Sequence, residues 1–250
     1  MSSVAATDEE VTLHDVPPGM FEKLKRALPA KVLQYSANRE ELWLPTEVQG
    51  LSWDSYEALL EALGDHSLRH IYDGGRLEIM MSPLEQHDWI KKFLGRMIEM
   101  LAFLLDVEVK CVGSTTQRRK GIKKGAEPDE GYYFASEPKV RGRRNRDSNL
   151  DPPLDLVVEV DITSNSQRRM EIYAAMRVGE VWHHDGTRLS FYRLAKNGGY
   201  VEATHSVTFP FIRASDLMRF LKLLDDLGET TVMKRFVAWA RKEIRAQRKK

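Results

Sequence analysis

The sequence is short of cysteine and of long apolar runs, and each shortage excludes a class of protein. Its one cysteine, Cys111, rules out an internal disulfide and a cysteine-based zinc cluster. It suits a reducing compartment, and we expect it to be buried and inert. No segment approaches the ~20 apolar residues of a membrane span. The stretch MSSVAATDEEV lacks the basic-then-apolar order of a signal peptide. These absences predict a cytoplasmic protein with no membrane partner.

Common cofactor and hydrolase motifs are absent as well, and net charge is low. The sequence contains no GxGxxG, Walker-type, GxSxG or HExxH pattern. A net charge of +1 indicates no overall attraction to nucleic acid, but the cations are unevenly placed. Ten Lys/Arg and four Asp/Glu occur between Arg118 and Arg146, and the chain ends in RKEIRAQRKK. Solvated loops would explain this pattern, as would a site for a polyanion.

What the sequence does contain is the pattern of a soluble globular protein of 250 residues. We expect an N-terminal extension over 1–50 with one short helix, a core over 51–212 and a helical appendage over 213–250. Apolar stripes in the last segment, beyond an already complete core, suggest a homodimer formed through the terminal helices.

The spacing of apolar residues predicts the order of elements in the core. Helices are expected over 52–63, 84–107 and 166–179, and hairpins over 69–83 and 180–194. Further strands are expected over 107–113, 127–135, 154–162 and 200–204, with an exposed loop over 138–153. This order predicts an α/β fold with a mixed sheet flanked by helices.

Two acids interrupt the most hydrophobic strand, LDLVVEVDI. Because side chains alternate along a strand, Glu159 and Asp161 share one face and leave the aliphatic face intact. Asp129 lies at the start of another predicted strand. If the strands are neighbours, three carboxylates converge, and a hard divalent cation such as Mg²⁺ or Mn²⁺ compensates their repulsion best. A solvated sheet face, or pairing with Arg168 and Arg169, is the alternative.

These residues carry a family resemblance. The runs EPDEGYYF, DPPLDLVVEVDITSNSQRRMEIYAAMRVGEVWHHDG and LSFYRL, in that order, resemble the Uma-two family of bacterial restriction-endonuclease-like proteins in the PD-(D/E)XK superfamily. The resemblance extends to YDGGRLEIMMSP and His87, and it spans roughly Leu51 to the end. It implies a restriction-endonuclease-like fold and a divalent-metal phosphodiesterase, with Asp129 and Glu159 as metal ligands.

The resemblance also draws attention to three further residues. Asp161 stands where the superfamily has a lysine, and Arg169 is the candidate replacement on the following helix. Arginine is a poor general base, so the nucleophile would come from metal-bound water. Asp161 then orients that water, ligates the metal or holds Arg169, and we favour the last. His87 has the spacing of a core residue, but the family places a histidine beside the site.

The favoured hypothesis is a metal-dependent DNA endonuclease that uses Asp129, Glu159, Asp161, Arg169 and His87. Arg118, Arg119, Lys123 and Lys124 are the expected nucleic-acid contacts. A degenerate nuclease fold that only binds DNA or another partner is the main alternative, because Asp161 and Arg169 replace the lysine. A hydrolase of RNA or of another phosphate ester is a third. His183 and His184 lie on opposite faces of a strand and are interpreted as structural or surface residues.

Overall fold

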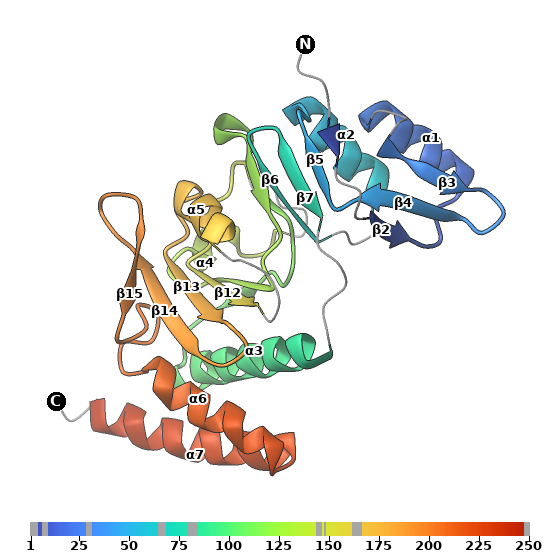
Figure 1. The fold of residues 1–250 in the computed structure, drawn as a ribbon. Coiled ribbons are helices and arrows are strands. Elements are labelled where there is room, and N and C mark those ends of the chain that lie inside the picture. The colour runs from blue at the N-terminus through green and yellow to red at the C-terminus, as the bar shows by residue number, and fades with distance from the viewer. Residues whose placement is uncertain are drawn as a thin grey trace. The chain divides into compact units, whose positions relative to one another are not determined.

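The computed structural model describes residues 5–6, 10–28, 32–64, 69–79, 85–143, 147, 149–161 and 167–247 (Figure 1). These residues form two compact units, Met1–Ser82 with Gln117–Glu127 and Pro83–Thr116 with Pro128–Lys250. Each unit has its own six-stranded sheet and its own buried core, and the first unit also contains a three-stranded sheet. The units differ from the boundaries expected at residues 50 and 212, because N-terminal strands join the sheet of the first unit and C-terminal helices enter the core of the second.

The first unit contains a six-stranded antiparallel sheet in the order β1-β5-β7-β6-β10-β9. A three-stranded antiparallel sheet, β2-β4-β3, and two helices accompany it. The short helix expected near the N-terminus is confirmed as α1, but the segment before residue 50 also contains strands that the sequence did not indicate. The elements are β1 (Ala5–Ala6), β2 (Glu10–Leu13), α1 (Pro18–Ala27), β3 (Gln34–Ser36), β4 (Glu41–Pro45), β5 (Glu47–Gln49), α2 (Trp53–Leu63), β6 (His70–Asp73), β7 (Arg76–Ile79), β9 (Gln117–Arg119), the 3₁₀ turn η2 (Lys120–Ile122) and β10 (Lys124–Ala126).

Two hairpins of this unit follow from local chemistry. Between β6 and β7, Gly74 and Gly75 adopt φ of 55° and 117°, which residues with a side chain rarely tolerate. The cation-rich segment forms the hairpin β9–β10, and its strand β10 pairs with β6. At Gly125 this hairpin lies so close to the buried Tyr56 that a Cβ would overlap the tyrosine hydroxyl. A glycine is therefore required for β10 to pack at this point.

The second unit contains a mixed six-stranded sheet in the order β15-β14-β13-β12-β11-β8. Strands β12 and β13 are parallel and connected through helix α5, and the other neighbours are antiparallel. The predicted fold class, α/β with a mixed sheet and flanking helices, is confirmed. The elements are α3 (Glu85–Leu105), β8 (Lys110–Cys111), β11 (Glu130–Tyr133), α4 (Glu137–Val140), β12 (Leu156–Val160), α5 (Gln167–Ala175), β13 (Glu180–His184), β14 (Leu189–Leu194), β15 (Tyr200–Ala203), α6 (Ala214–Lys222), the 3₁₀ turn η3 (Leu223–Asp225) and α7 (Glu229–Gln247).

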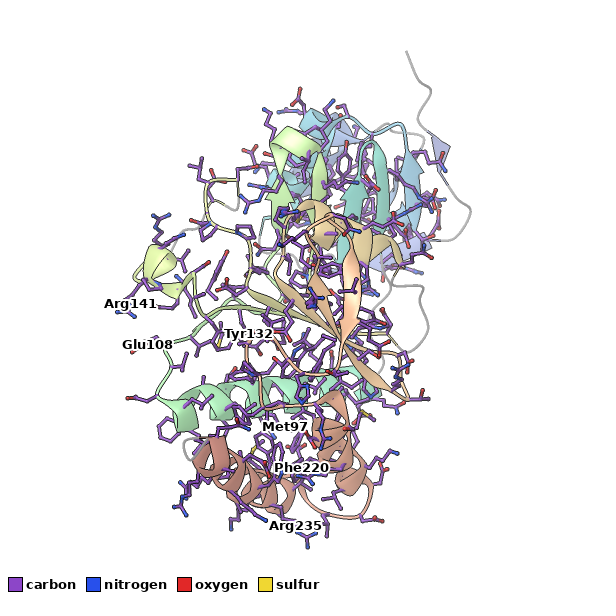
Figure 2. The ribbon with its side chains drawn as sticks, turned by 90° about the vertical axis from the view of Figure 1, so that its left-hand side faces the viewer. Met97, Glu108, Tyr132, Arg141, Phe220 and Arg235 are labelled. Carbon is purple, nitrogen blue, oxygen red and sulfur yellow. The ribbon has the colours of Figure 1, made fainter. Side chains whose placement is uncertain are left out.

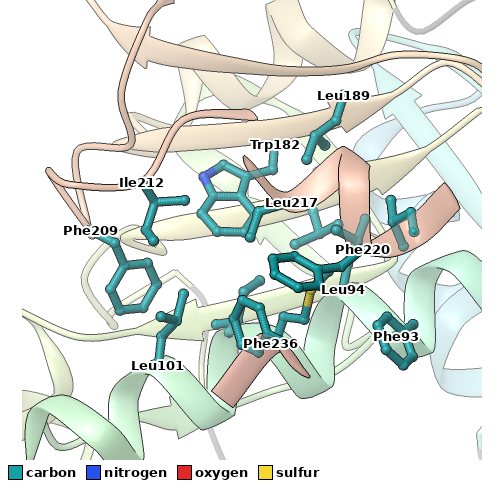
Figure 3. Packing of buried hydrophobic residues seen from close by; sticks show 14 of the residues in the cluster. Phe93, Leu94, Leu101, Trp182, Leu189, Phe209, Ile212, Leu217, Phe220 and Phe236 are labelled. Carbon is teal, nitrogen blue, oxygen red and sulfur yellow. The ribbon is translucent and has the colours of Figure 1, made fainter. Parts of the chain in front are cut away.

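The C-terminal helices belong to the core of this unit. Helix α3 packs against β12, and α6 and α7 pack against α3. Figure 3 shows Phe220 of α6 and Phe236 of α7 among the buried side chains that surround Leu94 of α3. The apolar stripes of the terminal helices are therefore covered within the chain. The expectation of a complete core without these helices is wrong, and dimerisation loses the argument that supported it.

Two smaller expectations also need correction. Cys111 is exposed rather than buried, because β8 is only two residues long and lies at the edge of the sheet. The segment expected as an exposed loop contains the short helix α4 and buries Val140 and Asp151. Among the described residues, no helix has both the length and the apolar character that crossing a membrane requires.

A buried carboxylate stabilises the start of β13, the strand that follows the α5 crossover. Glu180 is 1% exposed. Its Oε1 accepts hydrogen bonds from the Trp182 indole N–H at 2.8 Å and the Val207 amide at 3.0 Å. Its Oε2 accepts from the amide and hydroxyl of Thr208 at 2.9 and 2.7 Å. One side chain thus joins β13 to the segment that leads into α6.

We predict that Glu180→Ala lowers the free energy of unfolding by about 3 kcal/mol, because it leaves buried donors without an acceptor. Urea denaturation followed by tryptophan fluorescence measures this change. The control is Glu202→Ala, which removes an acid paired with Arg188 on the surface and should cost less than about 1 kcal/mol. Equal losses in the two variants would contradict the role assigned to Glu180.

Candidate active site

The end of β12 carries the acids that interrupt the strand. Leu156, Val158 and Val160 belong to the core of the second unit, so the expected aliphatic face is confirmed up to Val160. Ile162 lies outside the described residues. Glu159 and Asp161 point to the opposite side, where both contact the same arginine. Alternation along the strand therefore produces the paired acids that the sequence predicted.

Asp129 joins these acids through the pairing of β11 with β12. In the antiparallel register Glu130 lies opposite Val158, so the preceding residue, Asp129, faces the end of β12. Its Oδ2 accepts a hydrogen bond of 2.7 Å from the Val160 amide. The convergence expected for Asp129 and Glu159 follows from this register.

His87 of α3 holds the Asp129 carboxylate from the other side. Its Nε2 is 3.2 Å from each carboxylate oxygen of Asp129, and its Nδ1 is 3.1 Å from Asp88 Oδ1. The imidazole is buried, with 4% of the residue exposed. His87 lies on the buried face of the helix, as its spacing predicts, and it also contacts one of the acids.

Arg169 of α5 bridges Glu159 of β12 and Asp161, which directly follows the strand. Its Nη1 is 2.9 Å from Glu159 Oε2, and its Nη2 forms an ion pair with Asp161 Oδ1. The arginine is 2% exposed, and each of its two acidic partners is at most 6% exposed. A guanidinium stays protonated in proteins and offers donors along two edges, which suits two carboxylates at once. Of the roles considered for Asp161, the contacts match the holding of Arg169.

Tyr173, one turn after Arg169, completes the environment of Glu159. Its hydroxyl donates a hydrogen bond to Glu159 Oε1. Burial, with the neighbouring Glu159 charge, raises the pKa of the Tyr173 hydroxyl well above its ordinary value of 10. The hydroxyl therefore remains a donor, and the two oxygens of Glu159 are held by two residues of the same helix face.

His183 also contacts the cluster, although the sequence suggested only a structural or surface residue. In the parallel register it lies beside Glu159, and its Nε2 is 3.0 Å from Asp161 Oδ2. Burial lowers the pKa of His183 below its ordinary value, and the Glu159 charge opposes this shift only in part. His184 is structural, as its Nδ1 accepts from the Gly186 amide. Only the pairing of β12 with β13 could have identified His183.

The carboxylate oxygens of this cluster are suitable ligands for a divalent cation, but their arrangement is occupied by contacts within the protein. Carboxylate oxygens are the ligands that Mg²⁺ and Mn²⁺ prefer, and three buried carboxylates lie close together here. However, within the described residues no group of three or more His, Cys, Asp or Glu side chains is arranged to hold an ion. Arg169 and Tyr173 hold the oxygens of Glu159. An ion that bound this carboxylate would compete with Arg169 for it.

The cations expected to bind nucleic acid lie in the first unit, on the β9–β10 hairpin. Arg118 Nε is 3.3 Å from Glu57 Oε1, and Lys124 forms an ion pair with Asp73. Arg119 is half-buried, whereas Lys123 is exposed in the turn. Two of the four cations are thus engaged with acids of their own unit.

Three comparisons place the chain among known proteins. A family model named Uma2, described as "Putative restriction endonuclease", matches residues 53–221. A crystal structure of a putative nuclease belonging to DUF820, from Anabaena variabilis, is similar with a TM-score of 0.46 and 14% sequence identity, over 60% of this chain and 89% of that chain. No curated protein matches the sequence. Because the family model covers more than half of the chain and includes Asp129, Glu159, Asp161 and Arg169, the chain belongs to the Uma2 family of putative restriction endonucleases.

Proposed function

We propose that the protein is a cytoplasmic, divalent-metal-dependent endonuclease that hydrolyses phosphodiester bonds of DNA. The observation that carries this proposal is the convergence of three buried carboxylates from two neighbouring strands, within the segment that matches the family. The ion pairs of Arg169 with Glu159 and Asp161 could stabilise the fold without Asp129, so the presence of this third acid favours a functional site. Three buried carboxylates at one place suit a site that accepts positive charge.

The residues of the site have separable tasks in this proposal. Asp129 and Glu159 would hold Mg²⁺ or Mn²⁺, and the ion would supply positive charge and lower the pKa of bound water. His87 and the Val160 amide orient Asp129, and Tyr173 orients Glu159. Asp161 keeps Arg169 in the site. Arg169 can then hold phosphate oxygens through its planar donors, but it does not take up a proton from water.

The same contacts support one alternative, a nuclease fold that binds DNA or another partner without cleaving it. Arg169 already pairs with Glu159 and Asp161, and Asp161 stands where the superfamily has its lysine. In this alternative the arginine replaces the metal permanently. The two proposals differ in whether a divalent ion can compete with Arg169 for Glu159. Hydrolysis of RNA by the same residues is distinguished from DNA cleavage by a substrate panel.

We predict that Glu159→Gln lowers Mn²⁺-dependent nicking of supercoiled plasmid by at least about 100-fold, because the amide loses the charge that binds the ion. Gel electrophoresis of the plasmid measures the rate, and circular dichroism checks the fold. The control is Glu202→Gln, a surface acid of the same unit, which should nick as the wild type does. Undiminished nicking by the double variant Asp129→Asn/Glu159→Gln would exclude these acids as the reactive centre.

We predict that Arg169→Gln lowers the free energy of unfolding by about 3–5 kcal/mol in EDTA, because it leaves buried carboxylates without their cation. Mn²⁺ should then raise the melting temperature of this variant more than that of the wild type, since the ion no longer competes with the guanidinium. Thermal denaturation with and without Mn²⁺ measures both effects.

The matched control for this experiment is Arg188→Gln, which breaks an arginine–carboxylate pair with Glu202 in which the arginine is 65% exposed and the acid 49% exposed. It should change neither the stability in EDTA by more than about 1 kcal/mol nor the response to Mn²⁺. A wild type and an Arg169→Gln variant that both ignore Mn²⁺, while DNA binding persists in EDTA, would favour the binding module.

A further inference from the structure

The exposed face of α7 carries cations in a straight stripe. Lys234, Arg241 and Arg245 are all exposed and are separated by seven and four residues. With 3.6 residues per turn, these spacings place the three side chains within about 40° of one another around the helix. The rise of 1.5 Å per residue separates them along the axis by about 10 and 6 Å. They form a row of positive charge along one line of the helix, called here the α7 stripe.

The stripe points away from the core of its unit. Val232, Phe236 and Ala240 are buried on the other side of α7 and belong to the core cluster. A second pair of exposed cations, Arg235 and Lys242, flanks the stripe. Figure 2 shows Arg235 extending outward from α7, on the side opposite Met97 and Phe220. The positive charge is therefore directed to solvent, while the apolar face of α7 is already covered.

The acids of α7 do not neutralise the stripe. Glu229, in the first turn of the helix, accepts from the Trp89 indole N–H at 2.9 Å and forms an ion pair with Arg96 of α3. Glu243 is nine residues after Lys234, which places it about 180° around the helix. Within the described part of α7 these are the two acidic residues, and neither lies along the stripe. The charge of the stripe is thus of one sign.

Small side chains make room between the cations. An open depression on α7 is lined by Ala238, Arg241, Lys242, Arg245 and Ala246. A second depression, between α3 and α7, shares Ala238 and Arg241 with the first and includes Lys234. Glu229 also lines it, and its carboxylate is paired with Arg96 of α3. Ala238 and Ala246 are exposed and have short side chains, so a chain with repeated negative charges can approach the helix backbone beside the cations.

We propose that the α7 stripe binds the sugar–phosphate backbone of nucleic acid, and this inference rests on the proposed nuclease function. A backbone of evenly repeated phosphates matches a row of cations separated by less than two helical turns. Contacts of this kind position the nucleic acid without specifying its sequence. A membrane surface fits less well, because membrane-binding helices insert an apolar face, and that of α7 is buried in the core.

The test measures DNA binding rather than cleavage. A fluorescein-labelled DNA duplex is titrated with full-length protein in EDTA at several KCl concentrations, and anisotropy gives the dissociation constant. The stripe variant is Lys234→Gln/Arg241→Gln/Arg245→Gln, which keeps good helix formers at exposed positions. The control variant is Lys139→Gln/Lys196→Gln/Lys222→Gln, three exposed lysines of the same unit outside α7. Both variants lose the same net charge.

Each phosphate contact contributes about 0.9 to the slope of log K against log salt. We expect the slope of the stripe variant to be smaller than that of the wild type by up to about 2.7, with at least about tenfold weaker binding at low salt. The control variant should keep the wild-type slope. Both variants should remain folded by circular dichroism.

Equal slopes in the two triple variants, with binding by the wild type intact, would overturn the inference and leave the proposed function standing. Failure of the wild type to bind DNA at all would remove the proposed function and the inference together. Loss of binding to phosphatidylserine vesicles by the stripe variant, with DNA binding unchanged, would overturn the inference by assigning the stripe to a membrane surface.

Discussion

The second unit depends on the compensation of buried negative charge at the end of β12. Carboxylates at most 6% exposed are costly to keep ionised, and the guanidinium of Arg169 provides a fixed charge between two of them. The remaining donors come from a tyrosine hydroxyl, a backbone amide and two imidazoles. Every acid is therefore held by groups from segments distant in the sequence, and the cluster forms only when α3, β11, α5 and β13 are all docked around β12.

The two kinds of strand pairing around β12 have different consequences for this cluster. Strand β11 runs antiparallel to β12, so the start of β11 lies beside the end of β12. Asp129, which directly precedes β11, is therefore at the same end of the sheet as Glu159. The parallel partner β13 places His183 directly beside Glu159. A mixed sheet thus brings the beginning of one strand and the ends of two others to one place. The buried polar groups gather at this end of the sheet. At the other end of β13, Glu180 accepts hydrogen bonds from the Val207 and Thr208 amides and so has a structural role.

Much of this arrangement could be predicted from local sequence patterns, and the remainder depends on pairing and packing. Alternation identified Glu159 and Asp161 on one face, and the spacing of apolar residues located the helices and hairpins of the core. His183 was missed because strand order and direction are not encoded in the strand itself. The terminal helices were misjudged for a similar reason, since an apolar stripe looks the same whether it covers α3 or a second chain. The strands before residue 50 were missed because they are short, with five residues in the longest.

Because Gly125 lies so close to Tyr56, the base and the tip of the β9–β10 hairpin should tolerate substitution to different degrees. The base of the hairpin is fixed, because any side chain at Gly125 would collide with an aromatic ring stacked on Tyr72. The tip, Lys120 to Lys123, is exposed, and the amide of Gly74 is bonded to the carbonyl oxygen of Lys123. Side-chain substitutions at the tip should therefore be tolerated. The same substitutions at Gly125, two residues after the tip, would disrupt the packing of β10 against Tyr56.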